Sequence, residues 1–229
     1  MAVKKRGLGR GLDALLSGPT VTSLEEQAVQ ADERELQHLP LDLIQRGKYQ
    51  PRRDMDSTAL EELAQSIKSH GVLVQGFTFK SSGYSSLDDI AGVKIYNTYD
   101  VRIIDNILDD NFFGVYSQNC KRLEIRGNKI RAYGKAEQLI GNGIHGWKSD
   151  SLDIRENEII GHRDGVYLEF VTHTHVLNNL SQDNLRYGLH FMFSHDNSYV
   201  GNTFRSNGAG VAVMYTKNVH MENNRFEEN

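Results

Sequence analysis

The chain has 229 residues, of which 38% are hydrophobic and 24% charged, and its formal net charge is −4 at pH 7. This balance excludes a membrane-spanning chain and a wholly disordered one, and the negative charge gives no general nucleic-acid footprint. The single cysteine, Cys120, excludes an intramolecular disulfide and a cysteine-rich zinc site. The composition therefore predicts a soluble protein and leaves its function to the sequence patterns.

The first 38 residues divide into a basic and an acidic segment. Residues 1–16 carry four basic side chains and no acid before Asp13, together with spaced leucines, which is typical of a peptide that folds as a short amphipathic helix on a partner. Glycines interrupt the apolar stretch that a signal peptide requires, so we expect a cytoplasmic location for the chain as written. Residues 17–38 are polar, acidic and rich in small residues, which predicts a disordered linker.

Residues 39–71 have the pattern of a small α/β fragment. We expect a strand over residues 39–45 and, after a turn, a helix over residues 58–70. Thr58 and Glu61 form a capping box, apolar side chains recur at helical spacing, and a glycine ends the pattern.

Downstream of this fragment, a glycine is followed six times by an apolar residue and, fourteen positions after the glycine, by an asparagine. Successive glycines lie 22, 29, 22, 23 and 22 residues apart. The six pairs are Gly92/Asn106, Gly114/Asn128, Gly143/Asn157, Gly165/Asn179, Gly188/Asn202 and Gly210/Asn224. A fixed period of this length indicates a solenoid, whereas a β-sandwich has no such period. Because no helical pattern interrupts the turns, a parallel β-helix is favoured over a leucine-rich repeat.

The positions within each turn support a β-helix. Residues one, three and eleven positions after each glycine are mostly apolar, so we expect these three columns to point inward and the alternating positions to point outward. We expect the asparagines to stack at a tight corner, with left-handed backbone dihedrals and a side-chain hydrogen bond to the next asparagine. The sequence thus predicts a mainly β protein, with a truncated right-handed parallel β-helix of about six rungs over residues 72–229.

Two stretches near the amino terminus resemble a known family. GLGRGLDALL and LPLDLIQRGKYQPRRDMDSTALEELAQSIKSHGV are similar to the start of ParB-type chromosome-partitioning proteins. The resemblance implies that a ParA-type ATPase is bound by Lys4, Lys5, Arg6 and Arg10. It also implies a remnant of a nucleotide-binding motif at Gln50, Pro51, Arg52 and Arg53. Nothing downstream resembles the family's second phosphate-binding motif, its helix-turn-helix or its dimerising C-terminus, so we expect neither CTP hydrolysis nor specific DNA binding.

The repeats resemble a second family. NILDDNFFGVY, GHRDGVYLEFVT, DNLRYGLHFMFSHD and GNTFRSNGAGVAVMYTKNVHMENN are similar to the nitrous-oxide-reductase maturation protein NosD, a family of periplasmic copper-binding β-helices. The resemblance implies a non-catalytic accessory role in assembling the copper-sulfide cluster of nitrous-oxide reductase, with an ABC transporter and the reductase as partners. We expect no export signal in the chain as written, which departs from that family. We therefore interpret it as a chimeric composite of two truncated modules.

The repeat register also predicts which outward side chains become neighbours. Adjacent rungs of a β-helix lie about 4.8 Å apart, so residues at equal repeat positions stack. This places the following side chains on one face: His145, Glu169, His190, Met192 and Met214. Thioether and imidazole ligands select soft copper(I), so these residues are the metal candidates. An equally weighted alternative is a protein-docking face that includes Tyr116, Trp147 and Tyr167, because methionine and aromatic residues are common at adaptable interfaces.

A carbohydrate-binding or carbohydrate-cleaving β-helix is a further alternative. Glycoside hydrolysis requires two carboxylates that flank a groove. Glu169 is the only carboxylate in the outward columns, which lie two and four positions after each repeat glycine, so we expect no enzyme activity. The insertion at residues 133–140, which lengthens one turn, is interpreted as a docking loop because insertions in solenoids often lie on a binding face.

Overall fold

A computed structural model describes residues 57–85 and 87–229. The expectations for residues 1–16, 17–38, 39–45 and 50–53 therefore lie outside the described residues. Helix α2 (Ser57–His70) begins one residue before the predicted start and ends as predicted at a glycine. Gly71 has a φ of +73°, and a Cβ there would lie 2.0 Å from a backbone oxygen, so only glycine fits. No described helix is both long and apolar enough to cross a membrane.

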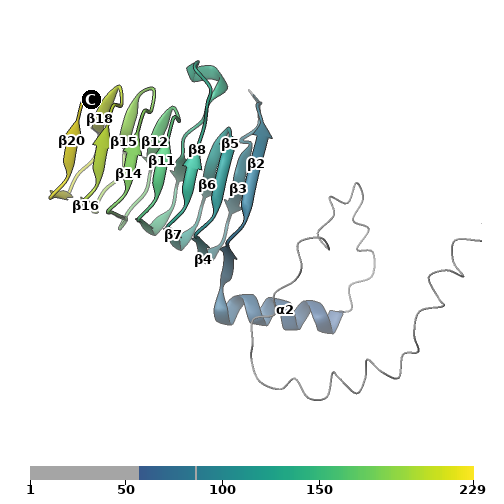
Figure 1. The fold of residues 1–229 in the computed structure, drawn as a ribbon. Helices are drawn as coiled ribbons and strands as arrows, with labels where there is room; N and C mark the ends of the chain where they lie inside the picture. Colours follow the sequence, from purple (N-terminus) through teal and green to yellow (C-terminus); the bar gives the residue numbers. More distant parts are fainter. Residues whose placement is uncertain (1–56, 86) are drawn as a thin grey trace, which may run out of the picture. The chain divides into compact units, whose positions relative to one another are not determined.

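Three parallel sheets follow the helix (Figure 1), and strands from successive turns lie side by side in each. Sheet A contains β1 (Val72–Gln75), β4 (Tyr99–Ile104), β7 (Lys121–Arg126), β10 (Asp150–Arg155), β13 (His175–Leu177), β16 (Asn197–Val200) and β19 (Val219–Glu222). Sheet B contains β2 (Thr78–Gly83), β5 (Ile107–Asn111), β8 (Lys129–Arg131), β11 (Glu158–Ile160), β14 (Leu180–Gln182), β17 (Thr203–Arg205) and β20 (Arg225–Glu227). Sheet C contains β3 (Ala91–Tyr96), β6 (Phe113–Gln118), β9 (Ile144–Trp147), β12 (Asp164–Glu169), β15 (Tyr187–Met192) and β18 (Ala209–Met214).

The predicted parallel β-helix is confirmed. Each complete turn runs through sheets C, A and B in that order, and the six strands of sheet C correspond to the six repeat glycines. Strands β1 and β2 precede the first repeat glycine and already pair in parallel with β4 and β5 of the first complete turn. Within the described residues, the β-helix therefore begins at Val72, directly after helix α2 and Gly71.

The core is built from the columns that were predicted to point inward. Ile103, Ile125 and Ile154 are fully buried and pair in register across sheet A. Each such side chain contributes about 1.5–3 kcal/mol through its removal from water. The last turn differs, because Val213 and Met221 occupy inward columns and are 47% and 56% exposed. Both lie on the outermost strands of their sheets, so no described strand covers them.

The asparagine ladder forms as predicted. The Asn128 amide donates to Asn157 Oδ1 at 3.0 Å, and the Asn157 amide donates to Asn179 Oδ1 at 2.9 Å. All but one of the six asparagines are buried: Asn106, Asn128, Asn157, Asn179 and Asn202. The predicted left-handed dihedrals are wrong for these residues. Positive φ angles belong instead to the preceding position, such as Glu156 at 56° and Asn178 at 54°, because the turn occurs one residue before each ladder amide.

Further ladders at the other corners were not predicted from the sequence. Nineteen positions after the repeat glycine, the Asn184 amide donates to Asn207 Oδ1 at 2.7 Å. His162 occupies this column one rung earlier, and its N–H donates to Asn184 Oδ1 at 3.0 Å. At the third corner, the Cys120 N–H donates to Ser149 Oγ at 3.1 Å. Side chains at all three corners thus satisfy backbone groups that the sheets leave unpaired.

The insertion at residues 133–140 forms a loop that contains a short 3₁₀ helix, η2 (Glu137–Leu139). Tyr133 is exposed, and its hydroxyl donates to Asp109 Oδ1 at 2.8 Å. The loop borders a 260 Å³ pocket lined partly by Tyr84, Phe112 and Leu139. Docking at this loop stays a prediction.

Candidate metal-binding face

The outer face of sheet C carries the residues that the sequence analysis grouped together. Strand pairing places four rings in one register column, which we call the ring column: Tyr116, His145, Tyr167 and His190. A second register column, called the thioether column, contains Trp147, Glu169, Met192 and Met214. Both columns were expected from the repeat spacing, and the strand register confirms them.

The ring column is a continuous stack. The ring centroids of Tyr116 and His145 are 4.8 Å apart, those of His145 and Tyr167 are 4.9 Å apart, and those of Tyr167 and His190 are 4.8 Å apart. The stack is more covered than an outward column was expected to be, because Tyr116 is 5% exposed and His190 is 2% exposed. Lys94 lies over the Tyr116 ring, 5.7 Å from its centroid. Tyr116 is therefore a buried part of this face rather than a docking residue.

Burial and a neighbouring carboxylate set the acidity of Tyr167. Its hydroxyl donates to Glu169 Oε2 at 3.2 Å. Burial, followed by the charge of Glu169, raises the pKa of Tyr167 to about 12. The tyrosine therefore stays protonated at neutral pH and acts as a hydrogen-bond donor to the thioether column.

His190 lies in a buried polar cluster that the sequence analysis missed. Its ring contacts Tyr167 and Tyr187, each at a centroid distance of 4.8 Å. Nδ1 lies 3.4 Å from Asp164 Oδ2, and Nε2 is buried without a hydrogen-bond partner. Asp164 is fully buried, and Arg186 Nε lies 3.8 Å from its other oxygen.

The sequence contained a signal for Asp164. The residue lies one position before the repeat glycine, where its column continues with Asn142 one rung earlier and Tyr187 one rung later. Its side chain faces His190 on the next rung, because the column that Asp164 occupies enters strand β12 beside the ring column.

His145 has a different environment two rungs from His190. Its Nδ1 lies 3.0 Å from the Asn142 amide nitrogen. Burial, aided by the nearby positive charge of Arg163, lowers the pKa of His145 to about 4, so the imidazole is neutral at pH 7. Because Tyr167 lies between the two imidazoles and two rungs span about 10 Å, His145 and His190 cannot share one ion directly.

The thioether column supplies the softest donors of the face. Met192 and Met214 pair in register, and both side chains are partly exposed. His190 and Met192 point to the same side of β15, with about 7 Å between their Cα atoms. Within the described residues, no group of three His, Cys, Asp or Glu side chains could hold a metal ion. A metal on this face would therefore need the thioethers, and the set of two sulfurs with one unpartnered imidazole nitrogen fits a soft ion.

An exposed aromatic stack borders the thioether column at the corner after sheet C. The rings of Phe170 and Phe193 stack at 5.2 Å, and those of Phe193 and Tyr215 stack at 4.8 Å. All three residues have φ near +50°, which is uncommon for bulky side chains. Lys148 holds the same position on an earlier rung, and its ammonium lies 4.4 Å from the centroid of the Trp147 ring.

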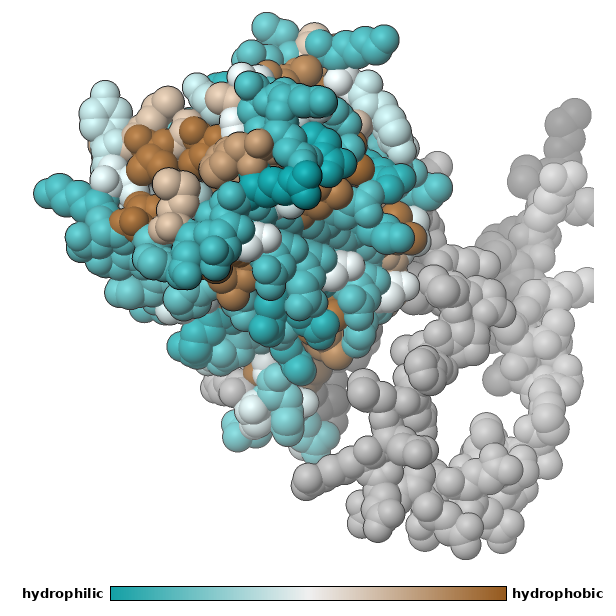
Figure 2. Space-filling view, turned by 60° about the vertical axis from the view of Figure 1, so that its left-hand side comes forward, coloured by the Kyte–Doolittle hydropathy of each residue, from teal (hydrophilic) through white to brown (hydrophobic). Residues whose placement is uncertain are grey.

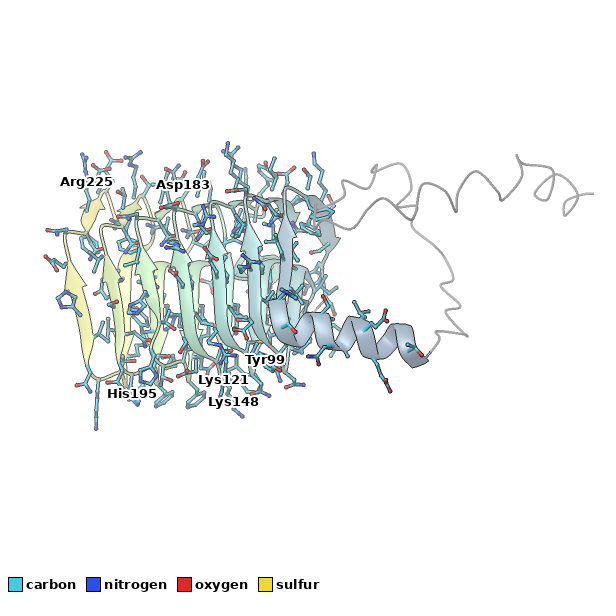
Figure 3. The ribbon with its side chains drawn as sticks, turned by 90° about the horizontal axis from the view of Figure 1, so that it is seen from below. Tyr99, Lys121, Lys148, Asp183, His195 and Arg225 are labelled. Atoms are coloured by element: carbon cyan, nitrogen blue, oxygen red, sulfur yellow. The ribbon has the colours of Figure 1, made fainter. Side chains whose placement is uncertain are left out.

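The face of the molecule that Figure 2 shows is largely polar. Figure 3 shows Tyr99, Lys121, Lys148 and His195 following one another along one edge of the solenoid, with Asp183 and Arg225 on the opposite edge. Figure 2, which brings the C-terminal rungs forward, also shows an apolar patch surrounded by polar side chains. Val213, Met221 and Phe226 of the last turn are exposed.

Comparison with family models gives two matches. Residues 130–229 match the periplasmic copper-binding protein NosD, and residues 25–87 match the ParB N-terminal domain. The second match extends past Gly71 into strands β1 and β2, which pair with the β-helix in the structure.

Known proteins are similar to parts of the chain. A probable chromosome-partitioning protein ParB of Pseudomonas putida is 60% identical over 107 residues, which is 47% of this chain and 37% of that protein. The ParB protein of Coxiella burnetii is 47% identical over 70 residues, 31% of this chain and 24% of that protein. The chain thus spans between about a quarter and a little over a third of the length of these relatives.

Among solved structures, the periplasmic alginate epimerase AlgG is similar with a TM-score of 0.44 and 15% identity, over 66% of this chain and 40% of that one. Two separate parts of the chain are thus similar to two families, residues 25–87 to the ParB N-terminal domain and residues 130–229 to the copper-binding protein NosD.

Proposed function

We propose that the β-helix is a non-catalytic accessory protein that binds copper(I) on the outer face of sheet C. The observation that carries the proposal is the register pair of Met192 and Met214 beside His190, whose Nε2 has no partner. Sulfur and imidazole ligands favour copper(I) over harder ions, and Glu169 adds one negative charge beside Met192. The name of the NosD family, copper-binding protein, supports the same metal.

The test is an anaerobic copper(I) titration of the full chain against a competing chelator. We expect one ion to bind, and we expect the triple variant His190→Gln, Met192→Leu and Met214→Leu to lose at least about tenfold in affinity. The matched control is His220→Gln with Met221→Leu, which removes an exposed imidazole and thioether on sheet A. A wild-type chain that does not bind copper(I), or a triple variant that binds like the control, would overturn the proposal.

The proposed partners follow from the resemblance to NosD. The bound copper would serve assembly of the copper-sulfide cluster of nitrous-oxide reductase, together with an ABC transporter. A docking role is supported by the partly exposed Trp147 and the exposed stack of Phe170, Phe193 and Tyr215 beside the thioethers. The proposal requires that metal-free reductase binds the full chain and that Phe193→Ala weakens this binding. Phe226→Ala, which removes an exposed ring from sheet B, serves as the control.

The similarity of the amino-terminal part to ParB favours a second candidate function. We propose that Lys4, Lys5, Arg6 and Arg10 bind a ParA-type ATPase, as the basic peptide at the start of ParB does by resemblance. The support is the 60% identity to the Pseudomonas putida protein. The full chain should stimulate ATP hydrolysis by ParA from Pseudomonas putida, and substitution of the four basic residues by alanine should remove the stimulation. Equal hydrolysis with and without the wild-type chain would refute this function.

A further inference from the structure

Among the residues that the structure describes, Asp164 is the only aspartate or glutamate that is buried, and its carboxylate has few partners. It is 0% exposed, at the first position of β12. Its Oδ2 faces Nδ1 of His190 at 3.4 Å, and its Oδ1 has no hydrogen bond, with Arg186 Nε at 3.8 Å. A buried carboxylate whose oxygens lack close hydrogen bonds costs several kcal/mol, so its presence here calls for an explanation beyond packing.

The neighbours of His190 hold its ring in one orientation. The rings of Tyr167 and Tyr187 each lie at a centroid distance of 4.8 Å from the imidazole. The Tyr167 ring is inclined at 80° to it and the Tyr187 ring at 64°. With the ring fixed in this way, the nitrogen that faces Asp164 is Nδ1. A carboxylate at that position accepts a hydrogen bond from Nδ1–H, which leaves the lone pair on Nε2.

We propose that Asp164 is a positioning residue that fixes the Nδ1–H tautomer of His190 and thereby presents the Nε2 lone pair to a soft metal ion. This inference rests on the proposed copper function and names the residue that prepares its imidazole ligand. Histidines that bind metals commonly donate their second ring N–H to a carboxylate, which orients the ring and raises its basicity. Arg186 balances part of the charge that Asp164 brings into this buried place.

Two measurements on the full chain test the proposal. Nitrogen chemical shifts of the metal-free protein report the tautomer of each imidazole, and the His190→Gln variant identifies the signals of His190 among the nine histidines. We expect Nδ1–H in the wild-type chain. Asp164→Asn should admit the other tautomer, because an amide can donate to Nδ1 as well as accept from it, and should lower copper(I) affinity by about 10- to 100-fold.

Asp150→Asn is the matched control, because Asp150 also faces an imidazole, that of His173 at 2.7 Å, at a corner away from this face. It should change neither the tautomer of His190 nor the copper affinity. An Nε2–H tautomer in the wild-type chain would overturn the proposal without any substitution, even where Asp164→Asn fails to fold. Unchanged affinity and tautomer in a folded Asp164→Asn variant would overturn it as well. A wild-type chain that shows the Nδ1–H tautomer and binds no copper(I) refutes the copper function and supports the positioning of His190 alone.

Discussion

The asparagine ladder should be one of the most sensitive features of the fold, and Asn179→Ala tests it. Asn179 Oδ1 accepts from both the backbone N–H and the side-chain amide of Asn157, at 2.9 Å each. Its own amide donates to the Ile154 carbonyl at 2.9 Å. Truncation to alanine leaves two buried donors of Asn157 without this acceptor. At about 1–3 kcal/mol for each stranded donor, the free energy of unfolding should fall by about 2–6 kcal/mol.

That loss is a large share of the roughly 5–15 kcal/mol that stabilises a typical folded chain, and it corresponds to a drop in melting temperature of roughly 5–20 °C. Urea denaturation followed by circular dichroism measures it. Asn178→Gly is the control, because Asn178 is exposed, precedes the ladder residue and has a φ of 54° that glycine adopts without strain. A loss below 1 kcal/mol in Asn179→Ala, equal to that of the control, would refute the assignment of stability to the ladder.

Three further predictions concern the corners and the response to pH. Gly165→Ala places a Cβ 2.0 Å from Ser181 Oγ and 2.6 Å from the Gly188 carbonyl oxygen, so it should lower the urea midpoint far more than Gly92→Ala, where the nearest atoms lie at 3.1 Å. Equal effects of the two substitutions would contradict this close packing. Burial lowers the pKa of His162 to about 4, so the unfolded chain binds the extra proton and stability falls as the pH drops from about 6.5 to 4. His162→Asn, which restores the ladder amide, should flatten that slope in urea titrations, and an unchanged slope would count against it. Hydrogen bonds, first from His173, lower the pKa of Asp150 to about 2, so its contribution is present above pH 4 and is lost toward pH 2. Asp150→Asn should therefore unfold with a weaker dependence on pH in that range, and acid denaturation that matches the wild type would argue against this pair.

The sequence by itself determined the class of fold and the register of its strands. Glycine and asparagine recur at one spacing because a Cβ at Gly165 would collide with the neighbouring rung and because a buried amide can both donate and accept along a ladder. Once the period was known, stacking followed from geometry. The pairs Tyr167/His190 and Met192/Met214 were therefore predictable without coordinates.

Only the tertiary structure decided how deeply these side chains are buried and which groups face them. His190 was expected on an open face, yet it is 2% exposed, because Tyr167 and Tyr187 cover its ring. The approach of Asp164 to His190 depends on the path of the chain into β12 rather than on residue spacing. A repeat pattern fixes which residues are neighbours along the solenoid, but rotation of the side chains and the path of the corners set burial, hydrogen bonding and hence the chemistry of the face.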